Sequence, residues 1–352
     1  MESRRYELHS SAADRSLLSE TAPGYRTVGL SGLLEDRGHR ARRVRVPGSG
    51  VVDGYRWRLA DCWDSTWWPQ GIAVTEHNQI PLLVTSWYAQ EKRGHKMGAR
   101  ISVLDLRDVR RPRYHHVLLV TAQRREGSIH FDPVHVHAGG IIVAGDRLLV
   151  AATFGGMREF LLSDIIRTPS TGRWRKAAGP FAYRHLLPES AGYRPAKAPA
   201  IERLRYSFVG LETGTPDLTD AATDAPGDAP TGVALVTGEY SPEDQGRLGR
   251  MLLADGRTTI ERTHVPTIPR MQGAVIHNGV WFVTASRGHR TNGDLWVGEP
   301  GAMTRHAGVL PPGPEDIAAW PDRDQLWSVS EFPRKRWVYA VGLSRWSRPP
   351  VD

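Results

Sequence analysis

Hydrophobic and polar positions along the chain repeat in one pattern, which predicts pairs of β-strands joined by tight turns. The clearest copy is MQGAVIHNGVWFVTASRG, residues 271–288, where two apolar runs flank the turn His-Asn-Gly. Related copies are PQGIAVTEHNQIPLLVTSWY from residue 69, AGGIIVAGDRLLVAATF from residue 138, a degenerate copy over 207–240, and PEDIAAWPDRDQLWSVSEF from residue 314. Repeated strand pairs of this kind are typical of the blades of a β-propeller.

We therefore predict an all-β fold, a β-propeller with five blades, and keep six blades as the alternative. The blades are expected at 67–123, 134–189, 203–267, 270–312 and 313–343, within a single propeller domain of residues 51–345. Residues 1–50 are expected to form an N-terminal arm, in which Arg42–Val46 alternates like a strand that closes the ring. Residues 212–232 are rich in Asp, Thr, Pro and Ala without apolar periodicity, which predicts a mobile loop insertion.

The composition of the 352 residues agrees with many short strands, because it combines 36 Gly and 25 Pro with a hydrophobic fraction of 40%. Cys62 is the only cysteine, which excludes an intrachain disulfide and a thiolate metal cluster. No stretch reads as a secretory signal or a membrane span, so we expect a cytoplasmic protein without a membrane partner.

The net charge is +8, and the basic residues that produce it are dispersed along the chain. They come nearest to forming a cluster in HRARRVRV, residues 39–46. This segment alternates basic and apolar residues, which favours an exposed edge strand over a nucleic-acid surface. Nucleic acid is therefore not expected as a partner, whereas an anionic small molecule would be attracted by the positive field. The oligomeric state is left open.

Alignment of the repeats places one residue of each blade at the entrance of its inner strand. These positions are Gln70, Gly139, Ser207, Gln272 and Glu315. Inner strands line the central channel of a propeller, so these residues are expected to meet at one face. Gln70 and Gln272 are predicted to orient a substrate, with hydrogen bonding between blades as the alternative.

The stretch HFDPVHVHAGG, residues 130–140, carries the most candidate chemistry. On a strand, His135 and His137 would point to the same side. We predict that they transfer protons at the channel mouth, with Glu315 as the partner acid or base. Hydrogen bonding to neighbouring loops is the alternative. No cofactor is expected, although a divalent metal stays open; its ligands would then be His135, His137, Glu315, Gln70 and Gln272.

A second ring of candidates follows from the ends of the second strands, which the topology brings to the same face. We expect these side chains to shape the substrate cavity or to pack between blades. They are Trp87, Tyr88, Phe154, Glu239, Tyr240, Arg287 and Glu331, together with Trp67 and Trp68 just before Gln70.

The stretches CWDSTWWPQGI, VHAGGI, MQGAV and the late PED resemble a group of propellers that includes strictosidine synthase-like, gluconolactonase-like and NHL-repeat proteins. The likeness is closer to uncharacterised actinobacterial propeller proteins. In gluconolactonase-like enzymes, channel-mouth carboxylates and amides hold a divalent metal, so the resemblance implies such a role for Glu315, Gln70 and Gln272. Strictosidine synthase-like enzymes act without a metal through a single carboxylate, which would fit Glu315 or Glu239 with His137.

These patterns together favour an enzyme that performs non-redox acid/base chemistry on a small molecule, and we expect it to act in specialised metabolism. Cyclisation, condensation, elimination and hydrolysis all belong to this class. The chain carries no Walker loop, no dinucleotide-binding glycine motif, no GxSxG elbow and no HExxH zinc motif. The alternatives are a non-catalytic propeller that binds a sugar, metabolite or protein, and a metal-dependent lactonase-like hydrolase.

Overall fold

The structure is a computed structural model that describes residues 6–21, 23–90, 97–171, 176–177, 182–195, 204–214 and 232–347. Strands dominate it, and helices are few and short. Most of the expected insertion at 212–232, namely 215–231, lies outside the described residues.

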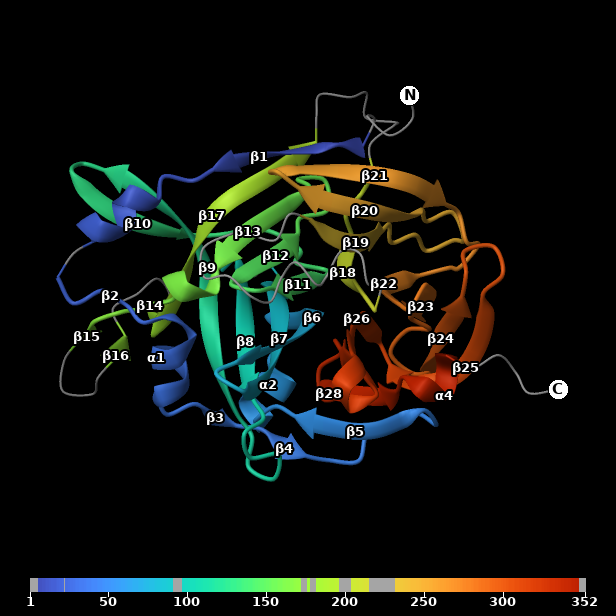
Figure 1. The fold of residues 1–352 in the computed structure, drawn as a ribbon. Coiled ribbons are helices and arrows are strands. Elements are labelled where there is room, and N and C mark those ends of the chain that lie inside the picture. Colours follow the sequence, from blue (N-terminus) through green and yellow to red (C-terminus); the bar gives the residue numbers. More distant parts are fainter. Residues whose placement is uncertain are drawn as a thin grey trace.

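Five antiparallel meanders of four strands can be followed in the described residues (Figure 1). The first contains β6 (Trp67–His77), β7 (Ile80–Ala89), β8 (Ala99–Asp105) and β9 (Arg113–Arg125). The second contains β11 (Ile141–Ala144), β12 (Arg147–Ala151), β13 (Met157–Leu161) and β17 (His185–Pro195). The third contains β18 (Phe208–Thr213), β19 (Val233–Gly238), β20 (Leu248–Ala254) and β21 (Arg257–His264).

The fourth meander contains β22 (Met271–His277), β23 (Val280–Ala285), β24 (Asn292–Gly298) and β25 (Thr304–Pro312). The fifth contains β26 (Pro314–Trp320), β27 (Gln325–Ser330), β28 (Trp337–Gly342) and β5 (Val51–Arg56). The inner strands β6, β11, β18, β22 and β26 contact one another in this order, and β26 returns to β6. This closed ring confirms the predicted all-β propeller.

The ring is closed by an N-terminal strand, but not by the segment expected. β5 pairs antiparallel with β28, so Val51–Arg56 is the closing strand. Within the predicted segment, β4 (Arg42–Arg43) only adds a short strand to the outer edge of β5. The alternation of β5 is hidden in the sequence by Asp53 and Gly54, whereas Tyr55 is buried and stacks on Trp327 with ring centroids 6.0 Å apart.

Short elements surround the ring. β1 (Leu8–Ala12) pairs with both β17 and β21, so the N-terminal arm joins two neighbouring meanders. β3 (His39–Arg40) and β10 (Ser128–Pro133) pair with β9. The remaining elements are β2 (Arg26–Thr27), β14 (Ile166–Arg167), β15 (Ser170–Thr171), β16 (Lys176–Ala177), helices α1 (Gly29–Glu35), α2 (Leu59–Trp63) and α4 (Ser344–Ser347), and the 3₁₀ turns Arg15–Glu20, Leu162–Asp164 and Pro321–Arg323.

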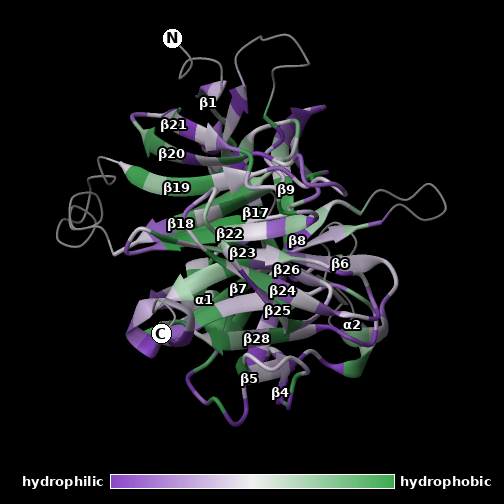
Figure 2. Cartoon of the chain, turned by 90° about the vertical axis from the view of Figure 1, so that its right-hand side faces the viewer, coloured by the Kyte–Doolittle hydropathy of each residue, from purple (hydrophilic) through white to green (hydrophobic). Residues whose placement is uncertain are grey.

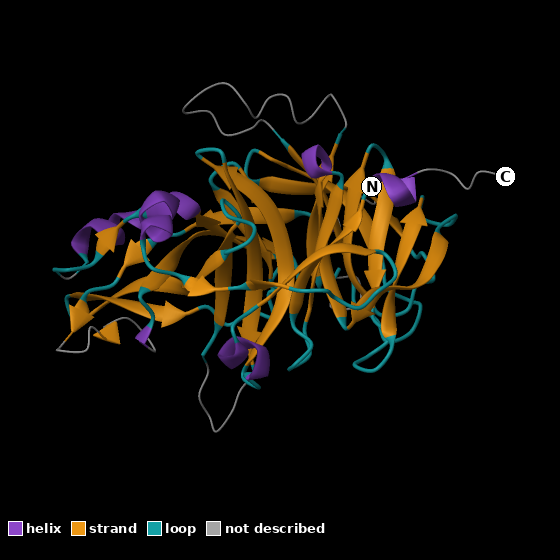
Figure 3. Cartoon of the chain, turned by 90° about the horizontal axis from the view of Figure 1, so that it is seen from below, coloured by secondary structure: helices purple, strands orange, loops and turns teal. Residues whose placement is uncertain are grey.

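Hydrophobic residues concentrate on the strands, and hydrophilic residues on the loops and edges (Figure 2). The buried clusters lie between neighbouring meanders, where Trp57, Trp87 and Trp327 are each almost fully buried. Seen from below, the helices lie at the periphery and the strands fill the body (Figure 3). Among the described residues, no helix is both long enough and apolar enough to cross a membrane.

Candidate active site

One open cavity of about 670 Å³ gathers the five entrance positions of the repeats. Gln70, Gln272 and Glu315 lie near the starts of β6, β22 and β26, while Gly139 and Ser207 lie just before β11 and β18. The other lining residues are His135, Val136, His137, Ala152, Thr153, Phe154, Arg205, Tyr240 and Glu331. The cavity therefore sits where the inner strands begin, at one end of the channel.

The three polar entrance residues are placed by the same local irregularity. The register of β6 with β7 shifts between Pro69 and Ile72, and that of β26 with β27 shifts between Pro314 and Ile317. A corresponding shift in β22 falls between Met271 and Gly273. Such bulges re-aim side chains next to a site. Each one frees an entrance residue from the regular ladder and lets it face the cavity.

Two carboxyl groups from neighbouring strands meet in the cavity. Glu315 on β26 is buried and shares a hydrogen bond with Glu331, which directly follows β27. Burial raises the pKa of Glu315 well above its ordinary value, and the adjacent Glu331 raises it further. Burial also raises the pKa of Glu331 to about 7, although the hydrogen bonds from Glu315 and Gln70 oppose the shift. Two carboxyls this close hold one proton between them at neutral pH.

Gln70 completes this group. It is buried, and its Nε2 donates to the carbonyl of Pro69 at 2.9 Å and to Oε2 of Glu331 at 3.4 Å. An amide donor favours the ionised form of its acceptor. The arrangement makes Glu315 the proton-bearing member and Glu331 the member that ionises near neutrality.

Asp316 points away from the cavity and has a different function in the fold. It is fully buried, and its Oδ2 accepts hydrogen bonds from the backbone amides of Ile72 and Ile141, each at 3.1 Å. The carboxyl thereby ties β26 to the inner strands of the first two meanders. Burial raises the pKa of Asp316 well above its ordinary value despite these bonds.

His135 and His137 both line the cavity, as expected, but they do so from a loop and not from a strand. Residues 134–140 form a loop between β10 and β11 rather than a strand, because Ala138 adopts a left-handed conformation with φ of 55°. Both side chains are exposed within the cavity. The ring of His137 lies 4.2 Å from that of Tyr88 between centroids, and the surrounding wall lowers the pKa of His137 by desolvation.

Aromatic side chains form the outer wall, as the ends of the second strands predict. Phe154 follows β12 and is 69% exposed, and Tyr240 follows β19 and is 40% exposed. Tyr88, at the end of β7, contacts the lining through His137. Exposed aromatic faces beside polar groups suit a planar or ring-shaped ligand.

The other candidates of the second ring lie outside the lining of the cavity. Trp67 and Trp87 are buried and sandwich the guanidinium of Arg100, at 4.4 and 4.8 Å from the ring centroids. Trp68 packs edge-on against Phe332. Trp67 and Trp68 begin β6, and Trp87 lies near the end of β7. Trp67 and Trp87 belong to a buried hydrophobic cluster, where apolar area is removed from water.

Glu239 is also held away from the cavity. It is buried and accepts two hydrogen bonds at 2.8 Å from the side chain of Arg247, as well as one from the amide of Arg205 at 2.9 Å. These partners lower the pKa of Glu239 in spite of its burial. Arg287 is exposed after β23 and does not line the cavity.

The sequence interpretation did not single out Arg205, and it did not pair Glu315 with Glu331. Arg205 precedes the degenerate repeat, where alignment is weakest, and its side chain lines the cavity. The carboxyl pair joins residues 16 positions apart, one on β26 and one directly after β27. The sequence signal for the pair is the position of Glu331 at the end of the strand that follows Glu315.

The described residues contain no group of three or more His, Cys, Asp or Glu side chains arranged to hold a metal ion. The five residues named as potential metal ligands, His135, His137, Glu315, Gln70 and Gln272, nevertheless share the cavity wall.

A second cluster of polar side chains connects a hydroxyl, an imidazole and a carboxylate in that order. The Oγ of Ser102 lies 2.8 Å from Nδ1 of His116, and Nε2 of His116 lies 3.3 Å from Oδ2 of Asp61. Ser102 and Asp61 are buried, and Asp61 also accepts from the Tyr114 hydroxyl and from Arg58. Desolvation lowers the pKa of His116 to about 3. None of these residues lines the central cavity, so the cluster is part of the core.

Comparison with known proteins gives weak similarities. No family model and no curated protein matches the chain. A gluconolactonase from Xanthomonas campestris shares 12% identity over 87% of this chain and 99% of its own, with a TM-score of 0.38. A glycoside hydrolase shares 10% over 87% and 94%, with a TM-score of 0.41, and the β-xylosidase RS223 shares 9% over 81% and 93%, with 0.37. Similarities at this level carry no argument about the activity, and the resemblance drawn from the sequence stays a prediction.

Proposed function

We propose that the protein is an enzyme that transfers protons to and from a small organic molecule at the Glu315–Glu331 pair. The observation that carries the proposal is this buried carboxyl pair, which lies in a cavity at the channel mouth. A general acid and a general base work best when their pKa values lie near the operating pH. A pair that ionises near pH 7 meets this condition, whereas ordinary surface carboxylates do not.

The two members have complementary roles. Glu331 as carboxylate takes a proton from the substrate or from an attacking water, while Glu315 as carboxylic acid gives one to the oxygen or nitrogen where negative charge develops. The pair then holds one proton as before, and transfer along its hydrogen bond restores the starting state. Hydrolysis, elimination, cyclisation and condensation all use this exchange, and we place the enzyme in this class.

The other lining residues complete the proposal. His137 and His135 offer a second route for protons between the cavity and solvent. Gln272 and the guanidinium of Arg205 would orient a carbonyl or an anionic group, and Phe154 and Tyr240 would cover a planar portion of the substrate. A small, ring-containing molecule with a polar or acidic substituent fits this lining best.

The test compares wild type with Glu315→Gln, which keeps the size of the side chain and removes its proton. Both proteins are incubated with a panel of lactones, esters, glycosides and mixed metabolite fractions, and substrate loss is followed by mass spectrometry. We expect at least one compound to be consumed by wild type, and the variant to be slower by about 10²-fold or more. A compound consumed equally by both proteins would contradict the assignment. Repeating the assay after chelation and after addition of Ca²⁺ or Zn²⁺ tests the lactonase-like, metal-dependent alternative.

A non-catalytic binding protein is the second candidate, because Phe154 and Tyr240 expose their rings to the cavity as sugar- and metabolite-binding proteins do. In that case a ligand found by thermal-shift screening would bind wild type and Glu315→Gln alike and be recovered unchanged. Phe154→Ala would then weaken binding more than Glu315→Gln.

A further inference from the structure

A second feature of the molecule lies outside the central cavity, on the outer strands where the N-terminal segment crosses from the first meander to the fifth. β3 pairs with the outer strand β9, and β4 pairs with the closing strand β5. In both pairs, arginine stands opposite arginine: Arg40 faces Arg113, and Arg42 faces Arg56. Like charges directly opposite each other destabilise a sheet. Two such pairs, separated only by Ala41, therefore break the usual rule of strand pairing at one place.

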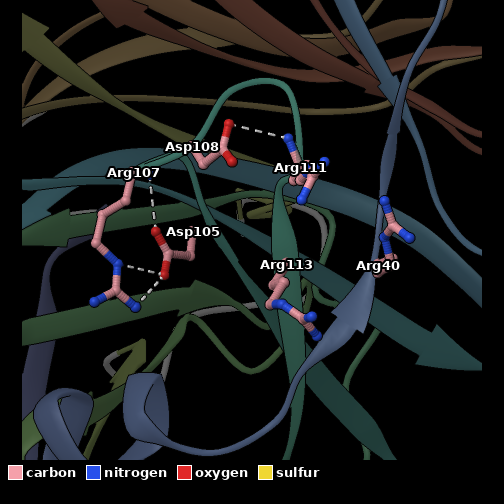
Figure 4. A pocket seen from close by; sticks show the side chains of 6 residues that line it. All are labelled: Arg40, Asp105, Arg107, Asp108, Arg111 and Arg113. Carbon is pink, nitrogen blue, oxygen red and sulfur yellow. Dashed lines mark hydrogen bonds and ion pairs between the residues drawn. The ribbon is translucent and has the colours of Figure 1, made fainter.

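Figure 4 shows the first of these pairs. The side chains of Arg40 and Arg113 project from adjacent strands, and Arg111 lies beside them. The two carboxylates of this depression are engaged elsewhere: Asp105 is bound by Arg107, and Oδ1 of Asp108 accepts from backbone amides, including that of Arg111 at 3.2 Å. Neither neutralises the facing guanidinium groups.

Arg40 also lines the next cavity, which has a volume of about 620 Å³. Six of its lining residues are arginines, and within the described part of the chain none of its lining residues is acidic. They are Arg40, Arg42, Arg43, Arg56, Arg58 and Arg110. A cavity of this size accommodates a small molecule rather than only a single ion.

Among the residues that the structure describes, two of the six arginines have a carboxylate partner. Arg43 pairs with Asp53 at 2.9 Å, and Arg58 pairs with Asp61 at 2.9 Å. For the other four, the described residues supply no carboxylate within ion-pair distance, and the Nε of Arg56 is buried without a hydrogen-bond acceptor. A compact group of like charges raises the free energy of the folded state unless a counter-charge is bound.

We propose that this cavity, between β3, β4, β5 and the turn before β9, binds a small ligand that carries two or more phosphoryl groups. Guanidinium groups match phosphate oxygens through paired hydrogen bonds, which makes arginine a favoured residue for phosphate recognition. Arg40 and Arg42 are two residues apart, which on an extended strand is about 7 Å. One phosphoryl group cannot contact both facing pairs equally, whereas an oligophosphate reaches from one to the other. Among the described residues, none lines both this site and the central cavity.

The test measures binding of tripolyphosphate by calorimetry at low and at physiological ionic strength. The double variant Arg42→Ala/Arg110→Ala removes two exposed arginines of the cavity. The control, Arg262→Ala, removes an exposed arginine from β21, the outer strand of another meander. We expect wild type and the control to bind equally, and the double variant to bind at least about tenfold more weakly. Because the double variant relieves repulsion, its melting temperature without ligand should be equal to or above that of wild type, which shows that it is folded.

Two further binding measurements identify the kind of molecule that supplies the phosphoryl groups. Binding to vesicles with a polyphosphorylated inositol lipid, reversed by tripolyphosphate, supports the site with a lipid headgroup as its ligand. Binding to a single-stranded oligonucleotide that tightens with its length and outcompetes tripolyphosphate would overturn the small-ligand proposal. Absence of tripolyphosphate binding, or equal binding by the double variant, would overturn it as well. Glu315→Gln should bind tripolyphosphate like wild type, so this result is independent of the proposed enzymatic activity.

Discussion

The carboxyl pair should make the stability of the folded protein depend on pH. Burial raises the pKa of Glu331 from 4.5 to about 7 in the folded protein. Between these two values the folded protein holds a proton that the unfolded chain releases, so stability must fall as the pH rises through this range. Each pKa unit corresponds to about 1.4 kcal/mol, which gives about 3 kcal/mol in total. Glu331 keeps part of its contact with water in the cavity, so we expect about 2 kcal/mol.

Glu331→Gln removes this titration while keeping the shape of the side chain and an acceptor for Gln70. Thermal unfolding of wild type and variant between pH 4.5 and 8.5 provides the assay. The melting temperature of wild type should fall relative to that of Glu331→Gln by roughly 3 °C or more across this range. The contribution of Glu331 is complete below pH 4.5 and lost above pH 7, so the two curves should converge at the acidic end.

The control for this experiment is Glu76→Gln, which removes an exposed carboxylate from the inner strand β6. Its curve should run parallel to that of wild type. Parallel curves for Glu331→Gln as well would refute the reasoning, because Glu331 would then ionise in the folded protein as it does in the unfolded chain.

Two further predictions concern neighbouring residues. His137→Ala should abolish turnover of a substrate identified for wild type while leaving the far-ultraviolet circular dichroism unchanged, and full activity would remove His137 from the site. Asp316→Asn should change the free energy of unfolding by less than about 1 kcal/mol, because the amide oxygen still accepts from Ile72 and Ile141, whereas Asp316→Ala should cost about 2–3 kcal/mol by leaving two buried amides without an acceptor. Equal urea denaturation midpoints for the two Asp316 variants would contradict this explanation.

The repeats in the sequence predicted the propeller and the meeting point of Gln70, Gln272 and Glu315. Both could be predicted because strand pairs recur with similar turn residues, and because each copy shows which position enters the channel. The closing strand was missed because Asp53 and Gly54 interrupt the alternation of β5, while the alternating Arg42–Val46 was more prominent.

The chemistry of the site was harder to predict from the sequence than the fold. Glu315 lies on β26 and Glu331 directly after β27, and the register of these two strands, including its bulge, brings their carboxyls together. For a similar reason, the sequence did not show which aromatic residues face the core and which face the cavity. Trp87 and Tyr88 are adjacent at the end of β7, but one turns into the core and the other toward His137. The facing arginines of β3 and β4 likewise depend on cross-strand register, which a single sequence does not specify.

Infrared difference spectroscopy detects whether Glu315 and Glu331 share a proton. Spectra of wild type and Glu315→Gln are recorded at pH 7 and subtracted, so that carboxyls unaffected by the substitution, including Asp316, cancel. A shared proton predicts a protonated-carboxyl band in wild type that the variant lacks, and a carboxylate band that grows in wild type as the pH rises through 7. Absence of a protonated-carboxyl band from the difference spectrum at pH 7 would contradict it, because Glu315 would then be ionised like an ordinary glutamate.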